Sequence, residues 1–497
     1  RAPAYRDRFE LDALGRERLA DPYTALLAAH AGLVAQAAAD SAAAPAARDA
    51  LDHVAATAET AARRALWLNA TFDLPGARLL CVGDHDLSSL AVAALVPGLA
   101  VTVADVDERL LSFIESRAAE RGHDIRCLYA DFRFGLPEVA VESADLVLTD
   151  PPYTPEGVAL FLGRGAQALR DRVNGRLVLA YGFSPLHPAL GMKTQRAVQD
   201  LDLVTEALLP AFNRYHGAQA VGSASDLYVL RPTARTFQVL DRKLAGAAVR
   251  IYTHGAQSLE ARAATLDPAV ARAVVETATG GDGEPSLLAG EGWPVPAGGA
   301  AAGVATGGAV TGAAAAVGLA ALFAAGVPAA AGRRAPVRVA VNLLGDPGPW
   351  LLRALLAVNA DRLALLVPNN HPDLVSQEAQ RALTGLVAPK YALCLRRSTP
   401  APDYAVVEAT AVPAAGGRVP AAPVAADLLS RAHGKTGNVW REALIRRGTG
   451  QAGGSLTKNE ARALIAGAVS RPAWLDARLI DLPRHAIERL LAAAAAL

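Results

Sequence analysis

The feature that most constrains the fold is an alternation of short apolar runs with helical stretches, which begins at Arg78. Such alternation is typical of repeated strand–helix–strand units and a parallel sheet. We therefore predict an α/β fold with a Rossmann-like sheet in this part of the chain. Strands are expected at 78–82, 101–106, 125–129, 146–149, 176–181, 225–230 and 249–253, and helices at 87–95 and 108–121.

Changes in amino-acid composition along the chain indicate the boundaries of its other domains. The N-terminal part is rich in Ala, Leu, Arg and Glu, which favours helices. A long stretch dominated by Ala, Gly and Pro is typical of a linker. The predicted domains are a helical N-terminal region at 1–74, a Rossmann-like catalytic domain at 75–266, a linker at 267–335, and a C-terminal α/β and helical domain at 336–497.

The predicted C-terminal domain repeats the order of apolar runs and helical stretches seen in the first unit. Residues 338–346 resemble residues 78–84, and each run is followed by a Leu/Ala-rich helix and a second apolar strand. Nothing in the second copy corresponds to Asp150–Tyr153, so we expect a degenerate, chemically silent Rossmann-like unit. Its tail is expected to be helical, with a capping box formed by Thr457 and Glu460.

Charge and cysteine content narrow the classes of partner. The chain has 49 basic and 48 acidic residues, and a net charge of +1 provides no global field for nucleic acid or an anionic membrane. Its three cysteines lack any metal-ligand spacing, so we expect reduced thiols, a cytoplasmic location and no metal. The uncharged stretch between Trp293 and Arg333 is mostly Ala and Gly, which argues against a membrane span.

Acidic residues follow the predicted strands. Parallel sheets bind ligands beyond the carboxyl ends of their strands, at the switch in strand order, so these side chains should meet in one crevice. An acidic residue after the second strand usually binds a ribose, which favours Asp105, and Asp131 could meet an adenine amino group. The first turn has one glycine, Gly83, beside Asp84 and Asp86, and this suits a cationic sulfonium better than a pyrophosphate. Helix capping by Asp86 or Ser88 is the structural alternative.

The run Asp150-Pro151-Pro152-Tyr153 ends the fourth predicted strand and indicates group transfer to nitrogen. The two prolines fix φ and remove two backbone donors, while Asp150 can accept a proton from an attacking amine. The ring of Tyr153 can wall the pocket. An ordinary exit from strand to loop is the alternative.

Five motifs together resemble the N(4)-bis(aminopropyl)spermidine synthase family, the branched-chain polyamine synthases, over roughly Arg78 to Thr253. The family has a methyltransferase-like Rossmann catalytic domain. Asp-Pro-Pro-Tyr alone is shared with many amino-group methyltransferases, and its combination with the other motifs is more specific. The motifs are Gly83–Leu87, Val103–Asp107, Thr149–Gly157, Leu160–Gly165 and Gly222–Leu230.

This resemblance implies an enzyme that moves aminopropyl groups from decarboxylated S-adenosylmethionine to the secondary nitrogen of spermidine. Asp150 would take or relay the proton, and Tyr153 would pack beside the acceptor. Asp226 would contact substrate or only brace the sheet. The donor would be held by Gly83, Asp84, Asp86, Asp105 and Asp131.

Two other functions stay open. The family loop has an acidic residue where His85 stands, and a titratable group there could tolerate the carboxylate of unmodified S-adenosylmethionine. The first alternative is therefore S-adenosylmethionine-dependent N-methylation or aminocarboxypropylation of a small-molecule amine. The second is a non-catalytic nucleoside-binding scaffold. The expected partner is a small-molecule amine rather than nucleic acid or membrane, with a homodimer as one option for assembly.

Overall fold

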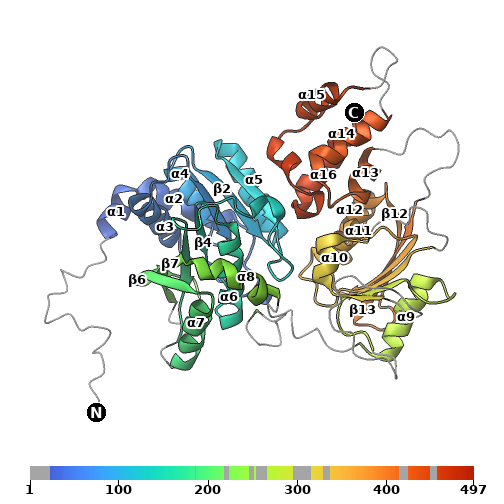
Figure 1. The fold of residues 1–497 in the computed structure, drawn as a ribbon, viewed down its shortest axis with the longest axis horizontal. Coiled ribbons are helices and arrows are strands. Elements are labelled where there is room, and N and C mark those ends of the chain that lie inside the picture. Colours follow the sequence, from blue (N-terminus) through green and yellow to red (C-terminus); the bar gives the residue numbers. More distant parts are fainter. Residues whose placement is uncertain are drawn as a thin grey trace.

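The computed structural model contains two α/β units, each built around its own sheet (Figure 1). Most of the chain between Tyr23 and the C-terminus is described. The described residues are 23–184, 186–217, 223–245, 251–252, 266–294, 315–327, 336–412, 424–447 and 456–497.

The first sheet has seven strands in the order β3-β2-β1-β4-β5-β7-β6. Strand β1 pairs in parallel with both β2 and β4, so the strand order switches at β1. Strand β7 runs antiparallel to β5 and β6. The strands are β1 (Arg78–Val82), β2 (Ala100–Asp105), β3 (Ile125–Tyr129), β4 (Leu146–Thr149), β5 (Arg176–Tyr181), β6 (Leu203–Arg214) and β7 (Ala224–Pro232).

Six of the predicted strands are confirmed, four of them with the predicted bounds. The sequence does not predict β6, because most residues in its first half are exposed and its apolar run contains Pro210, which argues against a strand. Of the expected strand at 249–253, only Ile251 and Tyr252 are described, and neither is in a strand. The remaining residues of that segment lie outside the described part of the chain.

Helices cover both faces of the first sheet because alternate strand residues point to opposite sides. Leu79 and Cys81 pack in one core with α3, α4 and α5, while Leu80 and Val82 pack in another with α6. The helices are α1 (Thr24–Ala29), α2 (Ala31–Ala43), α3 (Ala58–Thr71), α4 (Ser88–Leu95), α5 (Glu108–Arg121), α6 (Pro155–Ala168), α7 (Pro188–Asp200) and α8 (Ala234–Ala245), with the 3₁₀ turn η4 at Asp49–Leu51.

The second sheet has six strands in the order β12-β13-β11-β10-β8-β9. Strands β8 to β11 are parallel, whereas β12 and β13 are antiparallel to their neighbours, so the sheet is mixed. The predicted second α/β unit is confirmed. Its strands are β8 (Leu287–Ala289), β9 (Ala315–Val317), β10 (Arg338–Asn342), β11 (Arg362–Pro368), β12 (Tyr391–Arg397) and β13 (Tyr404–Ala411).

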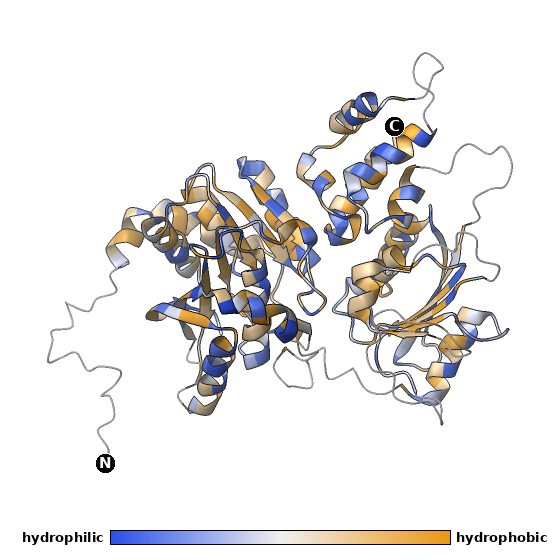
Figure 2. Ribbon diagram, viewed as in Figure 1, coloured by the Kyte–Doolittle hydropathy of each residue, from blue (hydrophilic) through white to orange (hydrophobic). Residues whose placement is uncertain are grey.

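Helix α9 packs on one face of this sheet, and α10, α11 and the C-terminal helices pack on the other. The predicted helical tail and the capping box of Thr457 and Glu460 are both present. Apolar residues gather along the strands of both sheets in Figure 2. The helices are α9 (Pro268–Thr279), α10 (Leu319–Ala325), α11 (Trp350–Ala357), α12 (Gln377–Val387), α13 (Val424–Ser430), α14 (Thr436–Arg447), α15 (Lys458–Ala468) and α16 (Arg484–Ala495).

The segment 267–335, expected to be a linker, contributes to the second unit. It supplies α9, α10, the edge strand β9 and its neighbour β8. Each of these strands has only three residues, and their alanines give little of the apolar periodicity by which a strand is predicted. The division of the chain into four domains remains a prediction. Within the described residues, no helix combines the length and apolarity needed to cross a membrane.

Helix α5 of the first unit lies against the second unit. The buried carboxylate of Glu115 accepts hydrogen bonds from the guanidinium of Arg471 at 3.1 Å and the indole of Trp474 at 3.0 Å. At the first residue of the same helix, Glu108 pairs with the buried Arg353 at 2.7 Å. Because buried charges are costly unless they are paired, these bonds hold the two units in one arrangement.

Candidate active site

A cavity of about 660 Å³ opens beyond the carboxyl ends of β1, β2 and β4. This is the switch in strand order, where open parallel sheets bind ligands. Ten of the eleven predicted site residues line the cavity, and their individual roles remain predictions. These ten are Gly83, Asp84, His85, Asp86, Asp105, Asp131, Asp150, Pro151, Pro152 and Tyr153.

Asp226 is the eleventh residue, and the cavity wall does not include it. Its side chain accepts a hydrogen bond of 2.7 Å from the backbone N–H of Ala211, where the pairing of β6 with β7 is irregular. This contact corresponds to the structural alternative, in which Asp226 braces the sheet.

The turn after β1 depends on Gly83. Its φ of +72° lies in the left-handed region that favours glycine, and it turns the chain toward the end of β2. Asp105 then accepts from the backbone N–H of Asp84 at 3.1 Å and of Asp107 at 2.8 Å. Burial raises the pKa of Asp105 to about 6 and the pKa of Asp84 to about 8, so these two carboxyls would be held ionised by a cationic ligand.

Asp150 is bound to a buried arginine that the sequence reading missed. Arg64, on α3, has 2% of its side chain exposed and donates from Nη2 to Asp150 at 2.6 Å and from Nη1 to Asp86 at 2.8 Å. Its Nε donates to Asn213 at 2.8 Å. One guanidinium therefore joins the first loop, the Asp-Pro-Pro-Tyr turn and β6.

The pKa of Asp150 reflects opposed effects. The pKa of Asp150 is raised to about 7, chiefly by burial. Arg64 acts to lower this pKa, and the neighbouring Asp86 acts to raise it. For Asp86, Arg64 outweighs burial and lowers the pKa. Asp86 thus stays ionised, while Asp150 titrates near neutral pH, where a general acid or base is most effective.

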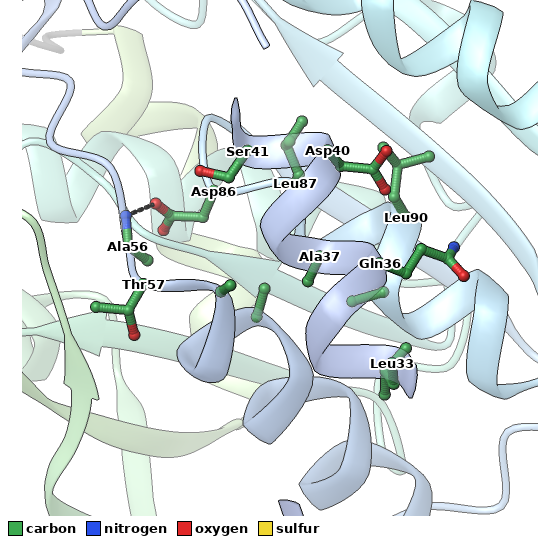
Figure 3. A pocket seen from close by; sticks show the side chains of 13 residues that line it. Leu33, Gln36, Ala37, Asp40, Ser41, Ala56, Thr57, Asp86, Leu87 and Leu90 are labelled. Atoms are coloured by element: carbon green, nitrogen blue, oxygen red, sulfur yellow. Dashed lines mark hydrogen bonds between the residues drawn. The ribbon is translucent and has the colours of Figure 1, made fainter. Parts of the chain in front are cut away.

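Asp86 also anchors the segment before α3. Its Oδ1 accepts from the backbone N–H of Ala56 at 2.7 Å, as Figure 3 shows. The alternative of helix capping by Asp86 or Ser88 is wrong, because the N-cap residue of α4 is Leu87, and the backbone N–H of Ser89 in its first turn donates to Asp84 at 3.2 Å. The pocket of Figure 3 shares Asp86 with the main cavity, but at about 10 Å³ it has room for roughly one water molecule.

Two tyrosines complete the surroundings of Asp150. Tyr153 donates to Asp150 Oδ1 at 3.2 Å, and Tyr215, at the end of β6, donates to Oδ2 at 2.7 Å. The two hydroxyls are 2.9 Å apart. The ring of Tyr153 packs edge-on against Tyr181. Asp150 is therefore held in one orientation, with both oxygens hydrogen-bonded to fixed donors.

His85 stacks on another residue that the sequence reading missed. The rings of His85 and His53 are 4.4 Å apart and nearly parallel. Burial lowers the pKa of His53 to about 3 and also lowers the pKa of His85. Both imidazoles are therefore neutral at pH 7, and His85 adds no positive charge to the cavity.

The far wall combines Asp131 with two phenylalanines. Phe132 and Phe161 meet edge to face at 4.8 Å and offer an apolar surface to a base. The carboxylate of Asp131 accepts three hydrogen bonds from Arg133 and one from the indole of Trp350 at 3.0 Å. An adenine amino group would have to share oxygens that already accept these bonds.

Arg64, His53 and Tyr215 are the main additions to the predicted site. Each comes from a segment without a recognisable motif and reaches the cavity through the fold. The signal that could have found Arg64 is its place, beside Arg63, in a stretch of α3 where Ala62, Ala65 and Leu66 are buried. An arginine within such a run needs a buried acidic partner.

Comparison with known proteins shows what the first unit resembles. Residues 35–239 match the model of the branched-chain polyamine synthase A C-terminal domain. An uncharacterized protein of Methanocaldococcus jannaschii is 35% identical over 189 residues, which are 38% of this chain and 47% of that protein. The N(4)-bis(aminopropyl)spermidine synthase of Thermococcus kodakarensis is 38% identical over 122 residues, 24% of this chain and 34% of that enzyme.

Solved structures match more weakly. The branched-chain polyamine synthase of Thermus thermophilus, in complex with N4-aminopropylspermidine and 5'-methylthioadenosine, is 24% identical with a TM-score of 0.36. The match covers 46% of this chain and 68% of that one. The chain spans less than half the length of the two sequence relatives described above. The family match begins before Arg78 and includes α3, so the resemblance of the first unit to the branched-chain polyamine synthases is confirmed, and it extends over residues 35–239.

Proposed function

We propose that this protein transfers an aminopropyl group from decarboxylated S-adenosylmethionine to a secondary amine of a polyamine such as spermidine. The family match and the relatives named N(4)-bis(aminopropyl)spermidine synthase support this reaction class. The observation that carries the proposal is the acidic composition of the cavity wall. Among the described residues that line it, seven are aspartates and one, Arg64, is a lysine or arginine.

That balance favours cationic ligands. A ligand carboxylate in the cavity would need hydrogen-bond donors for both of its oxygens. The guanidinium of Arg64 is not available for this, because it already donates hydrogen bonds to Asp86, Asp150 and Asn213. Decarboxylation of the donor removes its anionic group, for which the described part of the cavity wall offers no available lysine or arginine. Polyamines are protonated at neutral pH, so their ammonium groups suit the aspartates. The decarboxylated donor and a polyamine acceptor are therefore the best fit.

The reaction is an in-line displacement. The acceptor nitrogen forms a bond to the aminopropyl carbon next to the sulfonium, and the carbon–sulfur bond breaks with its electron pair going to sulfur. The leaving group is then neutral 5'-methylthioadenosine. The proton lost by the nitrogen passes to Asp150, whose orientation is fixed by Arg64 and Tyr215.

Asp105→Ala tests the predicted ribose contact. Loss of a hydrogen bond from a hydroxyl to a carboxylate should weaken donor binding by about 10- to 100-fold. Transfer at saturating donor should change little. Calorimetry with 5'-methylthioadenosine and steady-state kinetics would measure the two effects, and unchanged affinity would assign the ribose to Asp107 or another group.

Turnover should depend on the protonation of Asp150. Because the carboxylate form accepts the proton, kcat should rise as pH increases through about 7, the value to which burial raises the pKa of this group. A rate profile from pH 5.5 to 8.5 at saturating substrates would measure this rise. A profile that is flat or that falls over this range would contradict the role.

Donor and product analysis tests the proposal as a whole. The protein is incubated with spermidine and either decarboxylated or unmodified S-adenosylmethionine, and products are identified by mass. An aminopropyl adduct formed from the decarboxylated donor supports the proposal. Methyl or aminocarboxypropyl products from the unmodified donor would establish the first alternative. If neither donor bound, only the second alternative, a non-catalytic scaffold, would remain.

A further inference from the structure

Trp350 connects the second unit to the wall of the cavity. It is the first residue of α11 and is 5% exposed, and its indole N–H donates to Asp131 Oδ2 at 3.0 Å. Asp131 lines the cavity and Trp350 does not. Any effect of Trp350 on a ligand in the cavity must therefore pass through the side chains that it holds.

Arg133 belongs to the same contact. It donates to both oxygens of Asp131, and its guanidinium lies 4.9 Å from the centroid of the Trp350 ring. The guanidinium also lies 5.6 Å from the centroid of the ring of Tyr252, a cavity-lining residue. The indole therefore fixes Asp131 by a hydrogen bond and Arg133 by a cation–π contact.

Trp350 is itself held rigidly from within the second unit. Asp346, in the turn after β10, accepts from the backbone N–H groups of Trp350 and Leu351, both at 2.8 Å. The buried His371, which follows β11, is 2.9 Å from the same carboxylate. The loop after β10, the first residues of α11 and the residue His371 after β11 are thus joined by hydrogen bonds next to the indole of Trp350.

The same loop also touches a second wall of the cavity. The carbonyl of Pro347 accepts from Arg48 at 2.6 Å. Arg48 immediately precedes η4, and Asp49, Asp52 and His53 of the following segment line the cavity. The second unit therefore contacts two segments whose side chains form the cavity wall.

We propose that Trp350 is a positioning residue for the nucleoside of the donor, and that donor binding and docking of the second unit strengthen each other through Asp131. This inference rests on the proposed function, because it requires a nucleoside in the cavity. The second unit, although it lacks an Asp-Pro-Pro-Tyr turn, would then contribute to donor affinity. Binding equilibria are reciprocal, so a ligand favoured by docking must also favour docking.

Trp350→Phe removes the N–H donor and keeps an aromatic ring. We expect it to weaken 5'-methylthioadenosine binding by about tenfold, as measured by calorimetry on the full chain, because a hydrogen bond to a charged group is lost. The KM for the donor should rise in parallel, while kcat changes less than about twofold. A donor KM unchanged from that of the parent would overturn the inference.

Trp474→Phe is the matched control. It removes an indole N–H that also donates to a buried carboxylate across the same interface, at 3.0 Å to Glu115, away from the cavity. It should leave nucleoside affinity within about twofold of the parent. Equal losses in both variants would mean that docking in general, rather than Trp350, supports the cavity.

A double variant tests the route through Asp131. In an Asp131→Ala background, Trp350→Phe should cause no further loss of affinity, and additive losses would overturn the proposed route. On the unaltered protein, 5'-methylthioadenosine should slow amide exchange of Trp350 and Leu351, and unchanged exchange would contradict the coupling. If the parent binds no nucleoside, the proposed function itself fails. If it binds and the two tryptophan variants behave alike, only this inference fails.

Discussion

Arg64→Met is expected to lower the free energy of unfolding by about 3–5 kcal/mol and to abolish turnover, because it leaves two buried carboxylates without their shared cation. Arg64 donates to Asp86 and Asp150 from separate nitrogens and is 2% exposed. Methionine can occupy much of the same volume, so the loss would report the charge and hydrogen bonds rather than a cavity. Urea unfolding and initial rates would measure the two effects.

The stability loss should depend on pH. Without Arg64, burial and mutual repulsion raise the pKa of both carboxyls above their unfolded values. The folded state then binds more protons than the unfolded state, so stability falls as pH rises through the folded-state pKa values. The difference between variant and parent should therefore be larger at pH 8 than at pH 5.

Arg63→Met is the matched control on the same helix. Arg63 is partly exposed and packs over the rings of Tyr23 and Phe212. Its replacement should cost no more than about 1 kcal/mol, the usual scale of a cation–π contact near the surface. Equal costs at the two positions would contradict the assignment of Arg64 as the shared cation.

The sequence predicts the acidic part of the site well because that part is local. Asp84, Asp105 and Asp150 each end a strand or follow it within two residues, the apolar runs of these strands can be recognised, and parallel strands bring their carboxyl ends to one edge. These three aspartates therefore meet in the cavity as expected.

The cationic part of the site could not be predicted in this way. Arg64 is 86 residues before Asp150, and Tyr215 is 65 residues after it. No spacing rule relates residues that meet only after the sheet has formed. Trp350 is more distant still, because its bond to Asp131 joins two units that have separate sheets.

Asp150→Asn is expected to lower kcat by about 10²- to 10⁴-fold, the usual contribution of a positioned general base. Asparagine preserves the shape of the side chain and can still accept from Tyr215 and Arg64, but it cannot take the proton of the attacking amine. Binding of 5'-methylthioadenosine should remain close to that of the parent, because the nucleoside contacts are assigned to other residues. The rise of rate with pH near 7 should disappear with the carboxyl group.

The control for that variant is Asp145→Asn, at the opposite end of the strand that leads to Asp150. Asp145 pairs with Arg170 at the surface, and a surface pair contributes at most about 1 kcal/mol. Its replacement should leave kcat and the pH profile unchanged. If Asp150→Asn retained turnover similar to that of Asp145→Asn, the proton would have to leave by another group or through water. Asp150 would then serve only, through Arg64, to hold the first loop against α3.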